Sequence, residues 1–94
     1  MEVFIDEKAK NIIEKKGNVF TVKQIACGWA GTYKRLWSEA GSRLEDEKLF
    51  SRHQHGNISV FIDKSLNISD KVEIRLKSNN PLFGPMFIVE GVSL

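Results

Sequence analysis

The stretch Ile58-Ser59-Val60-Phe61-Ile62-Asp63 alternates aliphatic side chains with other residues, and Lys71-Val72-Glu73-Ile74-Arg75-Leu76-Lys77 alternates more strictly. A period of two residues sends successive side chains to opposite faces of a strand. Both stretches therefore predict β-strands that bury one face.

Towards the C-terminus, Asn79-Asn80-Pro81 interrupts the pattern, because the residue before proline avoids helix and proline lacks a backbone N–H. Residues 86–92 then predict a closing strand. Towards the N-terminus, residues 18–26 and 32–38 are rich in strand-forming side chains. They predict two strands around the glycine-containing turn Cys27-Gly28-Trp29-Ala30-Gly31.

The first sixteen residues predict a strand at residues 3–5 and a helix over Asp6 to Lys16. Asp6 is suited to be the helix N-cap, and Gly17 follows the last turn. In the middle of the chain, residues 48–50 predict a short strand, and residues 51–57 predict a loop. The predicted fold is therefore a β-rich α+β domain, a small sandwich or partly open barrel of about seven short strands with one helix against it.

Length and composition indicate one ordinary globular domain, residues 1–94. The 14 basic and 12 acidic residues give a formal charge of +2, with no basic block of the kind that binds nucleic acid or a membrane surface. No apolar run approaches the ~20 residues of a membrane span, and no signal peptide is evident, so a cytoplasmic protein is expected. The single cysteine excludes an intramolecular disulfide.

Cys27 is the strongest candidate functional residue. Glycines around it let backbone amides approach a ligand, and a sulfur at a strand end suits a soft metal or thiol exchange. The alternative is that Cys27 is a small buried apolar residue and that the glycines only form the turn.

His53 and His55 have the i, i+2 spacing that places two imidazoles on one face of an extended segment. Together with Cys27 they would supply three ligands for an open metal site. Nothing in the sequence brings the two segments together, and histidines in a polar loop are commonly solvated. The pair Lys34-Arg35 lies between aromatic residues, as in an RNA-binding strand, but no RNA-recognition consensus surrounds it, so no nucleic-acid partner is expected.

The order of elements and three segments resemble the HesB/IscA-like family of A-type iron-sulfur carriers. Residues 4–13 are similar to the opening helix of that family, Cys27 to Tyr33 to its Gly-Cys-Ser-Gly-x-x-Tyr turn, and residues 58–66 to a strand ending in Asp. The resemblance covers most of the chain and implies a compact β-rich pseudo-barrel with a flanking helix. It also implies no enzymatic activity.

The chain departs from the carriers at the cluster ligands. Carriers use three cysteines, two of them in a C-terminal Cys-Gly-Cys, whereas this chain ends at Leu94 with neither. Ala26 replaces the glycine before the cysteine, and the turn to Tyr33 is one residue longer. The ending also resembles a divergent HesB-like branch of small proteins, some with a Cys-Cys or Cys-selenocysteine pair at this turn.

The resemblance implies iron or an iron-sulfur cluster as cofactor, Cys27 as the metal ligand, and iron-sulfur assembly or acceptor proteins as partners. Because a 2Fe–2S cluster usually takes four protein ligands, a homodimer would supply only two thiolates and needs further ligands. Two other interpretations stay open. One is a non-enzymatic binding module that uses an exposed face around Trp29, Tyr33 and Trp37; the other is a single-thiol redox protein.

Overall fold

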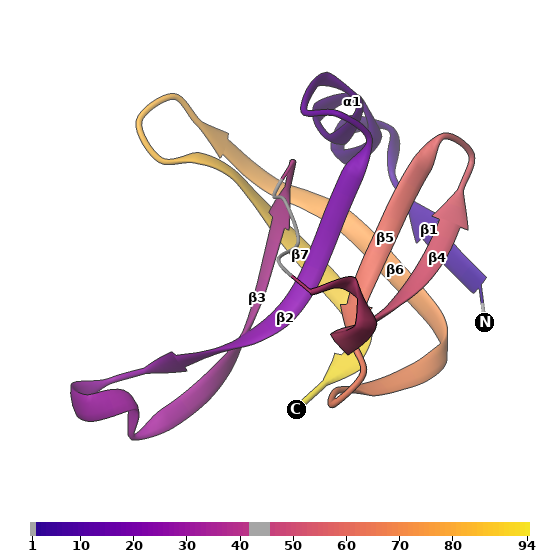
Figure 1. The fold of residues 1–94 in the computed structure, drawn as a ribbon. Helices are drawn as coiled ribbons and strands as arrows, with labels where there is room; N and C mark the ends of the chain where they lie inside the picture. The colour runs from indigo at the N-terminus through magenta and orange to yellow at the C-terminus, as the bar shows by residue number, and fades with distance from the viewer. Residues whose placement is uncertain (1, 42–45) are drawn as a thin grey trace.

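Two β-sheets face each other in the computed structural model, which describes residues 2–41 and 46–94 (Figure 1). The described residues form seven strands, one α-helix and two single-turn 3-10 helices, labelled η. In chain order these are β1 (Glu2–Ile5), α1 (Glu7–Lys15), β2 (Val19–Cys27), η1 (Trp29–Gly31), β3 (Tyr33–Ala40), η2 (Glu47–Leu49), β4 (Phe50–His55), β5 (Ile58–Asp63), β6 (Asn67–Asn80) and β7 (Gly84–Ser93). The predicted β-rich α+β class is confirmed.

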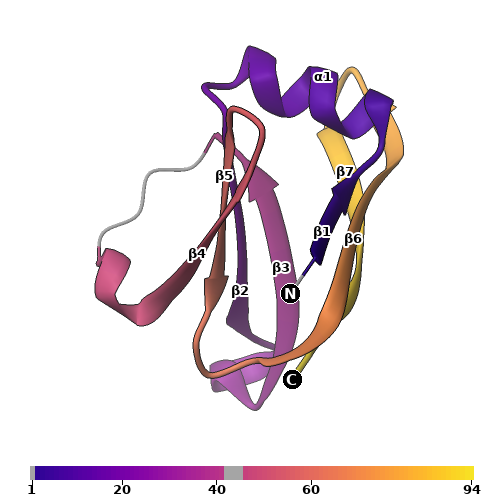
Figure 2. The ribbon, with the colours of Figure 1, turned by 90° about the vertical axis from the view of Figure 1, so that its right-hand side faces the viewer.

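Helix α1 lies across one end of the two sheets (Figure 2). The Asp6 carboxylate accepts the backbone N–H of Ala9 at 2.7 Å, so the predicted N-cap is confirmed. Ala9 and Ile13 are fully buried and point the apolar stripe of the helix into the core. Gly17 follows the helix at φ +102°, a left-handed conformation that glycine adopts without strain.

Each sheet combines parallel and antiparallel pairs. One sheet has the order β1-β6-β7, with β1 parallel to β6, and the other has the order β3-β2-β5-β4, with β2 parallel to β5. The inner faces of both sheets and α1 share one hydrophobic core. Its fully buried side chains include Ile13, Phe20, Val22, Ile58, Val60, Ile62, Val72 and Ile74.

The alternating strands that the sequence predicts are present as β5 and β6. In β6, Val72 and Ile74 are fully buried, Lys71 and Glu73 are exposed and Arg75 is half-buried, as the alternating pattern predicts. In β5 the prediction of one buried face is incomplete, because Phe61 on the opposite face is only 7% exposed. The guanidinium of Arg52 lies 5.9 Å from the centroid of the Phe61 ring and covers it.

The middle of the chain differs from its prediction. Residues 48–50 are not a strand but fall largely within the 3-10 turn η2, and residues 51–55 are not a loop but most of β4. Strand β4 pairs antiparallel with β5, and His53 lies opposite Val60. Because β4 is an edge strand, one partner and backbone hydrogen bonds suffice to hold it, and its side chains need not be apolar. The polar composition of residues 51–55 therefore does not predict a strand there.

Candidate functional site

The β2–β3 hairpin carries Cys27 away from the centre of the sheet. Strand β5 pairs with β2 only over residues 19–22, so the backbone of the rest of β2 pairs with β3 alone and forms a two-stranded ribbon (Figure 1). Cys27 pairs with Tyr33 at the last position of this ribbon. The cysteine thus lies at a strand end, as the sequence predicts, and its side chain is half-buried.

The turn beyond Cys27 depends on left-handed backbone conformations. Gly28 has φ +82° and Ala30 has φ +57°. A Cβ on Gly28 would lie 2.5 Å from the Tyr33 ring, so only glycine fits there without displacing the ring. Trp29 follows and is 89% exposed. The turn therefore presents an indole to solvent next to the only sulfhydryl of the chain.

The histidines lie far from this turn. His53, Val60 and Phe20 occupy one row across three strands, and Cys27 is seven residues further along β2. At about 3.3 Å per residue, His53 and Cys27 are separated by roughly 23 Å along the strand. Within residues 2–41 and 46–94 no three His, Cys, Asp or Glu side chains are grouped to hold a metal ion. The structure does not bring the Cys27 and histidine candidates together.

His53 takes part in a local hydrogen-bond chain instead. The Ser51 hydroxyl donates to the carbonyl of Ile62 at 3.2 Å, and its oxygen lies 3.0 Å from Nε2 of His53. This arrangement fits a neutral imidazole that donates through Nε2 to Ser51. Burial lowers the pKa of His53 below the usual histidine value. The residue is therefore accounted for by the packing of β4.

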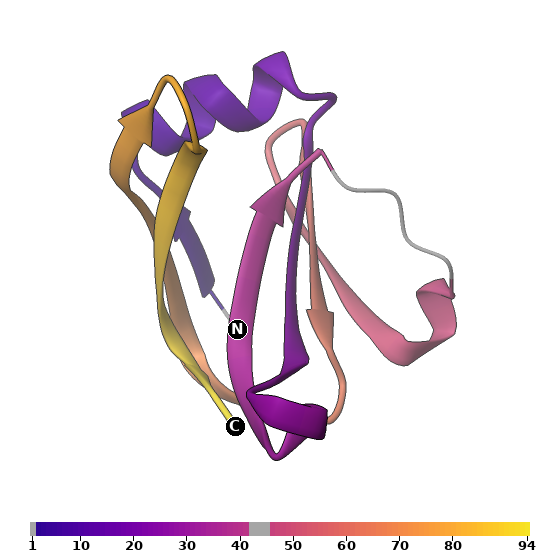
Figure 3. The same cartoon turned by 90° about the vertical axis from the view of Figure 1, so that its left-hand side faces the viewer.

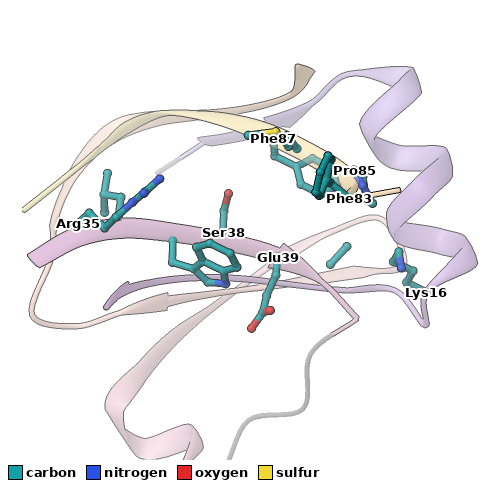
Figure 4. Close-up of a pocket in the computed structure, with 11 residues that line it drawn as sticks. Lys16, Arg35, Ser38, Glu39, Phe83, Pro85 and Phe87 are labelled. Atoms are coloured by element: carbon teal, nitrogen blue, oxygen red, sulfur yellow. The ribbon is translucent and has the colours of Figure 1, made fainter. Parts of the chain in front are cut away.

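A cleft of about 420 Å³ opens between the edge strands β3 and β7. The two strands belong to different sheets and lie side by side (Figure 3). Figure 4 shows Ser38 pointing across the cleft from β3, with Phe83, Pro85 and Phe87 on the opposite wall. Among the described residues, those that line the cleft are Lys16, Arg35, Leu36, Trp37, Ser38, Glu39, Ala40, Phe83, Pro85, Met86 and Phe87.

Charged side chains stand at both ends of the cleft. Arg35 lies at one end and Lys16, from the end of α1, at the other (Figure 4). Glu39 forms a 3.3 Å ion pair with Lys23, and its side chain points away from the wall formed by Phe83, Pro85 and Phe87 (Figure 4). Neither Arg35 nor Lys16 has a side-chain hydrogen bond or ion pair within the part of the chain that the structure describes. The cleft therefore combines apolar side chains from both walls with one cation at each end.

Part of the binding face expected from the sequence belongs to this cleft. Trp37 lines it, whereas Trp29 and Tyr33 lie at the hairpin end and do not. Sequence reasoning missed Phe83 and Met86, which are 82% and 50% exposed. The signal was the apolar run Pro81-Leu82-Phe83-Gly84-Pro85-Met86-Phe87, since a β-hairpin turn seldom needs so many apolar side chains.

Comparison with protein families matches residues 1–92 to the CC/Se motif containing family. Because the match spans nearly the whole chain, the protein belongs to this family. No curated protein and no solved structure matches the chain. The chain itself has one cysteine, with Ala26 before it and Gly28 after it, and therefore lacks a Cys-Cys pair. No helix of the described residues is long and apolar enough to cross a membrane.

Proposed function

We propose that this protein is a non-enzymatic binding module whose recognition site is the cleft between β3 and β7. The observation that carries the proposal is the combination of apolar side chains on both walls and two cations without side-chain partners among the described residues. A volume of about 420 Å³ is within the usual range of ligand sites, which are mostly apolar with a few polar groups that fix orientation. A ligand in the cleft would also remove exposed apolar surface, such as the Phe83 ring, from water.

An anionic apolar dye, 8-anilinonaphthalene-1-sulfonate, tests whether the cleft binds. Its rings suit the apolar wall, and its sulfonate suits Arg35 or Lys16. We expect enhanced, saturable fluorescence with the folded protein and amide chemical-shift changes concentrated at Trp37 and Phe87. Phe83→Ser is expected to weaken binding at least about threefold, because it removes an aromatic wall of the cleft.

Leu82→Ser is the matched control. Leu82 is 86% exposed and adjacent in sequence to Phe83, but it does not line the cleft. Leu82→Ser should bind the dye with an affinity within about twofold of that of the wild-type protein. Equal effects of the two substitutions, or shift changes away from β3 and β7, would contradict a binding site in the cleft.

A second candidate function is iron-sulfur or metal handling with Cys27 as ligand. One observation favours it: Cys27 stands at the end of a projecting hairpin rather than in the core. The order of one N-terminal helix and seven strands supports the proposal of a HesB/IscA-like pseudo-barrel. One thiolate per chain requires a homodimer, a partner protein or a small thiol to complete a cluster.

Anaerobic reconstitution with ferrous iron and sulfide tests this second candidate. Wild type should acquire a charge-transfer absorption band and stoichiometric iron, and Cys27→Ser should acquire neither. Cys27→Ala separates loss of the sulfur from an effect of the serine hydroxyl and should behave like Cys27→Ser. A colourless wild type without bound iron would exclude cluster binding by the isolated chain and leave the cleft as the candidate site.

A further inference from the structure

Strand β3 has an unpaired edge along the cleft. It is the terminal strand of its sheet, hydrogen-bonded to β2 on one side only. The Gly41 N–H donates to the Val19 carbonyl at 2.8 Å, which makes these residues a hydrogen-bonded pair. Since such pairs alternate along an antiparallel ladder, Leu36, Ser38 and Ala40 direct their backbone N–H and C=O groups to the free edge.

These three residues also line the cleft. Leu36 and Ala40 pack their side chains against the core and are partly buried, and Ser38 points across to β7, so the backbone edge is flanked by small or partly buried side chains. Lys34, which would repel many approaching strands, lies outside the cleft at the other half of β3. The part of the edge with accessible backbone groups and the apolar cleft therefore coincide.

The opposite wall is apolar. Phe83, Pro85 and Phe87 come from β7 and the turn before it. A strand added to β3 would send alternate side chains towards these rings. The distance from Leu36 to Ala40 is about 13 Å along the strand, which corresponds to about five residues of an added segment.

From these observations we infer that the cleft binds an extended segment of a partner protein, which adds as a strand to the edge of β3 and carries apolar side chains and at least one Asp or Glu. The inference rests on the proposed binding function and names its ligand. Main-chain hydrogen bonds supply affinity in this mode, and alternate side chains supply specificity. An acidic residue in the segment would pair with Arg35 or Lys16. The carboxylate of Glu39, the acidic residue among the described lining residues, is already paired with Lys23.

A second copy of the chain fits the cleft less well than a free segment. Its β3 would arrive bonded to its own β2 and accompanied by its own β7. The cleft lies between β3 and residues 83–87, so the edge strand of a second copy would have to enter between these two walls with the rest of its sheet attached. Association of two chains through β3 is therefore an outcome that the experiment must detect.

The experiment selects from a display library of random twelve-residue peptides on the immobilised full-length protein. We expect enriched peptides with alternating apolar residues and an excess of Asp and Glu over Lys and Arg. Synthetic versions should bind one to one by calorimetry, with the protein monomeric by light scattering. N-methylation of alternate peptide amides in one register should reduce affinity at least tenfold, and methylation in the other register should have a smaller effect.

Two protein variants locate the site. Arg35→Glu should weaken binding at least fivefold, whereas Lys64→Glu, an equal charge change in the turn after β5, should not. Ser38→Pro removes one outward N–H and should weaken binding at least tenfold. If Ser38→Pro does not fold, the N-methyl series decides the same point without a protein variant.

The inference is overturned by several results. These are no enrichment of any peptide, enrichment of basic peptides, binding that is insensitive to N-methylation in both registers, or binding of only a dimer through β3. Dye binding in the cleft separates the failure of this inference from the failure of the proposed binding function. If the dye binds there but no peptide does, the binding function stands and the peptide ligand is rejected.

Discussion

The rings of Phe20 on β2 and Phe87 on β7 meet edge to face, with centroids 4.9 Å apart and planes at 80°. This contact joins the two sheets on the side where their edge strands are not hydrogen-bonded to each other. Phe20 is fully buried, while Phe87 packs on the core and also lines the cleft. One aromatic pair therefore contributes to both the core and the candidate site.

Phe87→Ala should destabilise the protein by about 2–4 kcal/mol, because it removes packing from the core and leaves the edge of Phe20 uncovered. Urea unfolding followed by circular dichroism measures this free energy. Phe83→Ala is the control, since Phe83 is 82% exposed, and its effect should stay within about 0.5 kcal/mol. Equal destabilisation by both would show that Phe87 does not connect the sheets.

Gly91→Ala should destabilise the protein strongly, by about 3 kcal/mol or more. Gly91 has φ +90°, and a Cβ there would collide with the Lys71 carbonyl oxygen across the β6–β7 pair. Gly56→Ala offers a comparison, because Gly56 has φ +58° with no atom within 4 Å of a Cβ. It should cost only about 1 kcal/mol from backbone strain. A smaller effect at Gly91 than at Gly56 would contradict this close approach of strands.

Asp6→Ala should lower stability by about 1 kcal/mol, because it leaves the Ala9 N–H of α1 without its acceptor. Asp6→Asn retains an oxygen acceptor and should recover most of the loss. Thermal unfolding of the three proteins checks this order, and an Asn variant no better than Ala would mean that the charge, not the cap, is responsible.

The fold was largely predictable where side-chain pattern and burial agree. Val72 and Ile74 alternate in sequence with charged residues, and both are fully buried in the structure. The Asp6 carboxylate likewise caps the helix by accepting the Ala9 N–H, as the sequence predicts. Strand β4 was missed because its stability depends on backbone pairing with β5 rather than on apolar side chains. Local pattern carries no information about such a partner.

The candidate site was predictable only in part, because it is assembled from distant segments. The sequence predicts Trp37 as part of an exposed aromatic face, but its neighbours in the cleft, Phe83 and Met86, are more than forty residues later in the chain. The pairing of β7 with β6 and the packing of β7 beside β3 bring them together. For the same reason the distance between Cys27 and His53 could not be obtained from the sequence.

Lowering the pH should destabilise the protein partly through His53. Burial lowers the pKa of this imidazole in the folded state, so the unfolded chain binds the proton more readily. The stability contribution is fully present above about pH 6.5, the unfolded histidine pKa, and is lost as the pH falls from there through the lower folded pKa. Between pH 7.5 and 5, the midpoint temperature of thermal unfolding should therefore fall more steeply for wild type than for His53→Gln. The glutamine side chain can still donate a hydrogen bond to Ser51. If His55→Gln flattens the profile as much as His53→Gln, or if neither does, the buried imidazole of His53 is not the source.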